Sequence, residues 1–226
     1  MPELRREGEV YILDLGEDEN RFNPTTVGEI VSALEEVKTA EGPRALVTSA
    51  QGKFFSNGLD LDWMGSHPGE AGDLLTGVHS VLARLLLLPV PTVAAIQGHA
   101  FAAGAMLTLG HDFRVMRADR GFWCLNEVDV GLPFTPGMSA LIRSRLAPQL
   151  SHEAMTTARR YGGSDARSVG IVDDADAISE PEVLKAALER AAALAGKAGP
   201  ALGRIKAGIY GDVADRLHSS GPLEAV

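Results

Sequence analysis

Short apolar runs and helical stripes alternate along the first half of the chain. Residues 10–15, 45–49 and 91–96 are apolar runs of strand length, and each predicts a buried strand. Residues 25–40 instead repeat apolar side chains at helical spacing, which predicts an amphipathic helix. A strand, a helix and a second strand in this order predict parallel pairing and an α/β architecture.

The later part of the chain is increasingly helical. A second apolar stripe at helical spacing covers residues 74–86, small and apolar residues favour a helix over 102–109, and two short strands are predicted at 112–116 and 121–124. After Pro136 the pattern predicts helices over residues 138–146, 151–160, 181–197 and 201–217. The sequence therefore predicts an α/β fold in its first two thirds and a helical region after it.

Composition and charge exclude several classes of function. A formal net charge of −9 argues against nucleic acid as the main partner, because phosphate backbones bind basic faces. The single Cys124 excludes an intramolecular disulfide, and the histidines show no metal-ligand spacing, so no metal site is predicted. Pro89 and Pro91 interrupt the apolar stretch 81–109, so no membrane span is predicted. We see neither a secretory signal nor a targeting address in the final GPLEAV, and expect a cytoplasmic protein.

Three segments contain residues suited to chemistry. In FFSNGLDL (54–61), Gly58 permits a close approach of a ligand to the main chain. In QGHAFAAGAM (97–106), small residues open a helix directly after a buried strand, where free N–H groups can bind an oxyanion. In LNEVDVGLPFTPGMSAL (125–141), Glu127 precedes an apolar alternation that favours a partly desolvated carboxylate and a general base. Taken singly, each segment also suits an ordinary role in a turn, in helix packing or at a strand end.

Taken in order, the three segments resemble those of the enoyl-CoA hydratase/isomerase family, the crotonase superfamily, over about residues 10–150. Residues 55–61 are similar to the family's first oxyanion segment, FxxGxDL. Residues 97–105 are similar to its second, usually NGxAxGGG, and 127–133 to the segment with the downstream catalytic glutamate. The chain contains neither GxGxxG nor GxxxxGK[ST], so dinucleotide and P-loop sites are not predicted.

This resemblance implies a crotonase-like spiral of ββα units with a helical C-terminal region, an acyl-CoA substrate and no separate cofactor. It implies that residues 1–160 hold the acyl-CoA site and that residues 161–226 mediate assembly into a homotrimer or a dimer of trimers. By position, the backbone N–H groups of Asn57 and Ala103 would hold the thioester oxygen, and Lys53 would meet a CoA phosphate. Further substrate contacts are expected at Phe55, Ser56, Gly58, Leu59, Asp60, Leu61, Gly104 and Phe134.

One position departs from the hydratase pattern. Hydratases use two glutamates, and the first of these positions is Met106 here, whose thioether cannot transfer a proton. Glu127 remains, and Asp129 shares its face only if this segment is a strand. One carboxylate suffices for a double-bond shift, so we predict a Δ3,Δ2-enoyl-CoA isomerase of fatty acid metabolism. Three alternatives stay open: a hydratase or other CoA-thioester enzyme with an acid from elsewhere, a non-catalytic acyl-CoA-binding protein, and a soluble α/β domain outside the family whose motifs match by chance.

Overall fold

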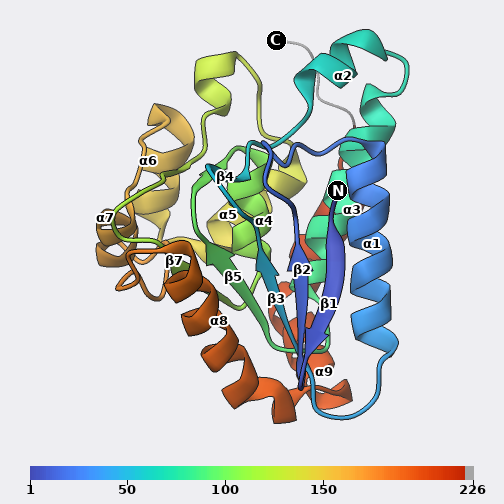
Figure 1. Ribbon diagram of the computed structural model, residues 1–226. Coiled ribbons are helices and arrows are strands. Elements are labelled where there is room, and N and C mark those ends of the chain that lie inside the picture. Colours follow the sequence, from blue (N-terminus) through green and yellow to red (C-terminus); the bar gives the residue numbers. More distant parts are fainter. Residues whose placement is uncertain (222–226) are drawn as a thin grey trace.

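The computed structural model describes residues 1–221, in which two sheets lie among helices (Figure 1). Residues 222–226, the end of the predicted helical region and of its GPLEAV sequence, lie outside the described residues. The larger sheet has the order β1-β2-β3-β5-β7, with bounds Glu3–Glu7, Val10–Asp14, Ala45–Ser49, Thr92–Ile96 and Phe113–Met116. The smaller sheet has the order β4-β6-β8, with bounds Phe54–Ser56, His99–Phe101 and Trp123–Cys124.

The chain repeats a strand–strand–helix unit. Each repeat after the first adds one parallel strand to the larger sheet and one to the smaller sheet before the helical segment begins. The helices of the four repeats are α1 (Pro24–Thr39), α2 and α3 (Leu61–Ser66 and Ala71–Leu86), α4 (Ala103–Gly110) and α5 (Pro136–Arg145). The spiral of ββα units that the resemblance implies is therefore present.

The central strands are apolar on both faces because helices cover both faces. Alternate residues of β2, such as Tyr11 and Leu13, join the main core with α1 and α3, whereas Val10 and Ile12 join a second core with α8 (Glu180–Leu194). Figure 1 shows α8 on one side of the larger sheet and α1 on the other. This double burial explains why the strand segments read as continuous apolar runs.

The C-terminal helices pack onto this core. They comprise α6 (Pro148–Thr157), α7 (Gly163–Ser168), α8, the short 3-10 helix η2 (Ala195–Lys197) and α9 (Pro200–Ser219). Helix α9 lies against α3 and α5. Within residues 1–221, no helix is long and apolar enough to cross a membrane.

The predicted and observed elements differ at the sheet edges. The strands predicted at 10–15, 45–49 and 91–96 are confirmed to within one residue at each end. β1 was not predicted because its sequence, ELRRE, has no apolar pattern; it is an edge strand that pairs antiparallel with β2. β8 lies within the strand predicted at 121–124 but has only two residues, whereas β4 and β6, with three residues each, are too short to show a period.

Candidate active site

Glu127 begins a 3-10 helix, η1 (Glu127–Val130), that follows the smaller sheet. The helix ends at Gly131, whose φ of 69° lies in the left-handed region that favours glycine, and both Gly131 and Leu132 donate their N–H groups to the Glu127 carbonyl. The segment is therefore not a strand: Val128 and Val130 are 50% and 48% exposed, whereas Glu127 is only 5% exposed. Asp129 is exposed, so it does not share the inward direction of Glu127.

The Glu127 carboxyl group is buried, and one of its two oxygens has no partner in the described chain. Its Oε2 atom is inaccessible to solvent and has no hydrogen-bond partner among the described residues. Burial raises the pKa of Glu127 to about 7, because the ionised carboxylate loses its hydration there. A group with this pKa is present in both protonation states near neutral pH, which suits successive proton removal and return.

Glu127 lines a small cavity of about 60 Å³ together with residues from the other two predicted segments. Of the predicted site residues, the cavity brings together Asn57, Leu59, Leu61, Ala103 and Glu127. The rest of the lining is largely apolar, with Leu132 and Met138 among its members. Glu127 is the sole carboxylate among the residues that line this cavity within the described chain. Three segments distant in sequence thus meet around one acid.

The N-terminus of α4 reaches the same cavity. Ala103 is the first residue of this helix, and its N–H group has no acceptor among residues 1–221, so it can donate to an oxyanion near the positive end of the helix. The preceding residue, Ala102, has φ 49° and ψ −123°, a conformation that costs energy for any residue with a Cβ atom. Backbone strain is therefore stored directly beside the free N–H group.

Two glycines allow the segments to approach each other. A Cβ atom on Gly58 would lie 3.0 Å from Ala102 Cβ and 3.2 Å from the Ala103 nitrogen, and its φ is +81°. A Cβ atom on Gly104 would lie 2.4 Å from the carbonyl oxygen of Ser56. Gly104 therefore serves close packing between α4 and β4 here, because its open side faces protein backbone.

Asn57 lines the cavity but its predicted donor is already engaged. The Asn57 N–H group donates to the Glu19 carbonyl oxygen at 2.8 Å, and the side-chain Nδ2 atom is 3.2 Å from a Glu19 carboxylate oxygen. A substrate oxygen would have to share this N–H group or displace the Glu19 carbonyl.

The remaining predicted contacts lie around the cavity rather than in its wall. Lys53 is exposed, with its ammonium group 5.0 Å from the centre of the Phe54 ring. Phe55 and Ser56 are buried in the core region, and the Asp60 side chain caps α2 by accepting from the Trp63 N–H group at 3.1 Å. Phe134 is half-buried and packs against the main core.

The position where a hydratase carries its first glutamate holds no acid. Met106 is fully buried and belongs to the main hydrophobic core, as its place on an apolar helix predicted. Among the described residues, no group of three or more His, Cys, Asp or Glu side chains is arranged to hold a metal ion. Among the described residues that line this cavity, Glu127 is therefore the one with a carboxyl group that could transfer a proton.

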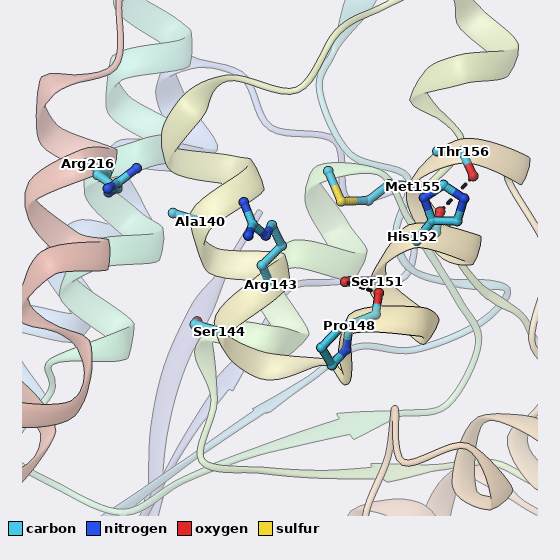
Figure 2. A pocket seen from close by; sticks show the side chains of 9 residues that line it. All are labelled: Ala140, Arg143, Ser144, Pro148, Ser151, His152, Met155, Thr156 and Arg216. Carbon is cyan, nitrogen blue, oxygen red and sulfur yellow. Dashed lines mark hydrogen bonds between the residues drawn. The ribbon is translucent and has the colours of Figure 1, made fainter.

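A much larger cavity, of about 690 Å³, lies between α5, α6 and α9 (Figure 2). Arg143 and Arg216 are its charged residues, and His152 and Met155 line it from α6. It contains none of the predicted site residues and no carboxylate, so volume alone does not mark the chemical site.

One polar residue of the cavity wall is not among the predicted site residues. Asn126 lines the cavity beside Glu127, and its Oδ1 atom is buried without a partner. Its position directly before Glu127 was the available signal, but an asparagine before a turn usually indicates a cap.

Comparisons with known proteins show which family this chain is similar to. The family model described as enoyl-CoA hydratase/isomerase matches residues 9–223. A protein named enoyl-CoA delta isomerase 2, peroxisomal, from Arabidopsis thaliana is 40% identical over 218 residues, which cover 92% of this chain and 91% of the relative.

Solved structures show the same architecture. A probable enoyl-CoA hydratase from Mycobacterium tuberculosis H37Rv aligns with a TM-score of 0.88 and 26% identity, covering 96% of this chain and 92% of the other. Human mitochondrial delta3-delta2-enoyl-CoA isomerase aligns with a TM-score of 0.87 over 96% of this chain and 85% of its own; at 23% identity this likeness concerns the fold alone.

Proposed function

The chain belongs to the enoyl-CoA hydratase/isomerase family of the crotonase superfamily, and on that premise we propose that it is an isomerase that converts 3-enoyl-CoA to 2-trans-enoyl-CoA. The observation that carries the proposal is a lone buried carboxylate, Glu127, in a cavity that also receives the N-terminus of α4. Such an isomerisation needs one group that accepts a proton and returns it, and it needs no water and no separate cofactor.

In the proposed mechanism, the Glu127 carboxylate removes a proton from C2 of the substrate, which the thioester and the neighbouring alkene acidify. The electron pair of the C–H bond moves into a dienolate, whose oxygen accepts a hydrogen bond from the Ala103 N–H group. Asn57 adds a second hydrogen bond when its N–H group turns from the Glu19 carbonyl or shares its hydrogen. Glu127 then delivers the same proton to C4, and the double bond lies between C2 and C3.

The two catalytic contributions are of similar size. Removing one oxyanion donor typically costs about 3–4 kcal/mol of transition-state stabilisation, and a positioned base contributes roughly 10²–10⁴-fold. Because the N–H donors belong to the backbone, side-chain substitutions at Asn57 and Ala103 leave them in place. The Glu127 side chain is therefore the part of this machinery that mutagenesis can remove cleanly.

A proton NMR assay tests the proposed reaction. Purified protein is incubated separately with 3-enoyl-CoA and with 2-trans-enoyl-CoA, and the vinyl and C3 signals are followed. We expect conversion of the first substrate to the second, without 3-hydroxyacyl-CoA as the main product. Faster addition of water would show a hydratase, and tight CoA-ester binding without turnover would show a binding protein.

Assembly and location are proposed separately. We propose that residues 161–226 mediate a trimer or a dimer of trimers, which the exposed Ile205 and Ile209 on α9 support, at 59% and 62% exposure. Light scattering on the purified chain tests this, and a monomer would contradict it. We also propose a cytoplasmic location, to be tested by fractionation, although the Arabidopsis relative is named peroxisomal.

A further inference from the structure

Asn126 occupies a helix N-cap position without acting as a cap. It precedes η1, and its backbone carbonyl accepts from the Asp129 N–H group at 3.1 Å, so the backbone is held in place. Asparagine at such a position normally accepts a backbone N–H group with its side-chain oxygen. Here the side chain makes no cap hydrogen bond, and its Oδ1 atom is buried without a partner. The Asn126 carboxamide is therefore available for a hydrogen bond with another group.

The free carboxamide and the catalytic acid share one cavity. Asn126 and Glu127 are neighbours in sequence, both line the cavity, and each carries a buried side-chain oxygen without a hydrogen-bond partner in the described chain. A buried polar atom without a partner is costly, so a pair of them in one wall indicates that a contact is completed during function. The rest of the wall is largely apolar and offers few other partners.

We propose that Asn126 is a positioning residue that donates an Nδ2–H hydrogen bond to one carboxyl oxygen of Glu127, leaving the other oxygen to carry the proton between C2 and C4. The amide has two N–H donors and does not titrate, so it can hold the acid in both protonation states. A rotation of the Asn126 side chain, including a 180° flip of its amide group, would direct the Nδ2–H group toward the Glu127 carboxyl oxygen. The inference rests on the proposed function of Glu127.

Few other titratable groups face Glu127. On β8, burial raises the pKa of the Cys124 thiol to about 11, and on η1 Asp129 is exposed. Helix α4 carries no titratable side chain. Helix α6, which packs against η1, carries Glu153, which binds Arg159 and Tyr161, and His152, which lines the separate cavity of Figure 2. The acidic limb of the activity profile therefore reports on Glu127, and His152→Gln should leave that limb in place.

The test compares pH profiles of kcat for 3-enoyl-CoA isomerisation in wild type and Asn126→Leu. Leucine has a similar volume but no donor, so kcat should fall about 10- to 100-fold as the acid loses its orientation, while KM changes less than about twofold. Loss of a hydrogen bond to the carboxylate should also move the acidic limb upward by about one pH unit. Asn126→Gln, which keeps the amide, should restore part of kcat and move the limb back.

Asn23 provides a matched control. It is also an asparagine at an N-cap, but its Oδ1 atom accepts from the Thr26 N–H group at 3.0 Å and caps α1. Asn23→Leu should therefore lower the melting temperature and leave the pH limb unmoved. If the acidic limb of the kcat–pH profile lies at the same pH in Asn126→Leu as in wild type, the inference is overturned, whether or not kcat falls. Activity of Glu127→Gln at the wild-type level would instead overturn the proposed function on which it rests.

Discussion

Two buried polar regions of the chain differ in whether their groups have partners. In the first, which we name the α9 anchor, Lys206 is 3% exposed and its ammonium group donates to the Val90 carbonyl at 2.8 Å and to the Asp112 carboxylate at 2.7 Å. The same carboxylate accepts from the Thr92 N–H group at 2.8 Å. Lys206 and Asp112 thus both have hydrogen-bond partners within the protein, so this region fixes the C-terminal helix to the sheet.

The second region is the wall formed by Asn126 and Glu127, where one buried side-chain oxygen of each residue has no partner among residues 1–221. Both regions take polar groups out of water, but only the α9 anchor recovers hydrogen bonds within the protein. The difference teaches that burial alone does not identify a functional group. The absence of a partner, next to a cavity, is the feature that distinguishes Glu127 from Lys206.

The largest expected effect is on turnover, when the unpartnered acid is removed. Glu127→Gln keeps the shape of the side chain but cannot accept the C2 proton, so kcat should fall by about 10³-fold or more. Acyl-CoA affinity, measured by calorimetry, should stay within about threefold. Asp129→Asn, on the same turn but exposed, is the matched control and should keep its turnover. Retention of most activity by Glu127→Gln would remove the basis for the proposed mechanism.

Removing a partner in the α9 anchor should affect stability instead. Lys206→Met leaves the partly buried Asp112 carboxylate without its cation, which should lower the free energy of unfolding by about 1.5–3 kcal/mol. Lys185→Met, at an exposed pair on α8, should change it by less than about 0.5 kcal/mol. Denaturant titration measures both. A loss at Lys206 no greater than at Lys185 would mean that the anchor does not hold α9.

The pKa of Glu127 links the site to stability. In the folded chain this pKa is raised from 4.5 to about 7, so the folded state keeps a proton that the unfolded state has lost. The contribution of Glu127 to stability should therefore be full below pH 4.5, fall by about 3 kcal/mol as pH rises to about 7, and change little above that. Glu127→Gln removes this dependence, so at pH 8 it should be more stable than wild type. Equal unfolding free energies at pH 8 would contradict the burial of an unpartnered charge.

A smaller effect is expected where α4 begins. Ala102→Gly removes the Cβ atom from a residue at φ 49°, and we expect a net gain of about 1 kcal/mol after the added chain entropy of glycine is counted. Ala105→Gly, within the same helix, should lose about 1 kcal/mol or more. Thermal unfolding measures the change in stability for both variants. A gain at Ala102 with a loss at Ala105 would support strain at Ala102, and changes of the same sign at both positions would argue against it.

Much of this arrangement could be predicted from the sequence, and the remainder depends on long-range contacts. The buried strands β2, β3 and β5 are visible because both their faces are apolar, whereas β1 is stabilised by pairing with β2 rather than by any pattern of its own. The burial of Met106 follows from its place on an apolar helix, and that of Glu127 from its apolar surroundings in the sequence. Residues 127–130 form a 3-10 helix that ends at Gly131 and directs Glu127 inward. The sequence pattern instead predicts an apolar alternation over this segment.

Other features of the site depend on partners far away in sequence. The hydrogen bond from the Asn57 N–H group to Glu19 joins two loops 38 positions apart, and no local pattern announces it. The sequence also gives no sign that the Asn126 side chain is free, because only the structure shows that the expected cap hydrogen bond is not made. Local patterns thus locate candidate residues, while the availability of their polar atoms is decided by tertiary contacts.

The most direct measurement follows a labelled proton. A 3-enoyl-CoA that carries deuterium at C2 is converted in ordinary water, and the 2-trans-enoyl-CoA product is analysed by mass spectrometry and proton NMR. Because the Glu127 carboxyl group is shielded from solvent, we predict that a measurable fraction of the product carries the deuterium at C4. Product with no deuterium at C4, even in a single turnover, would contradict a transfer carried out by one enclosed acid.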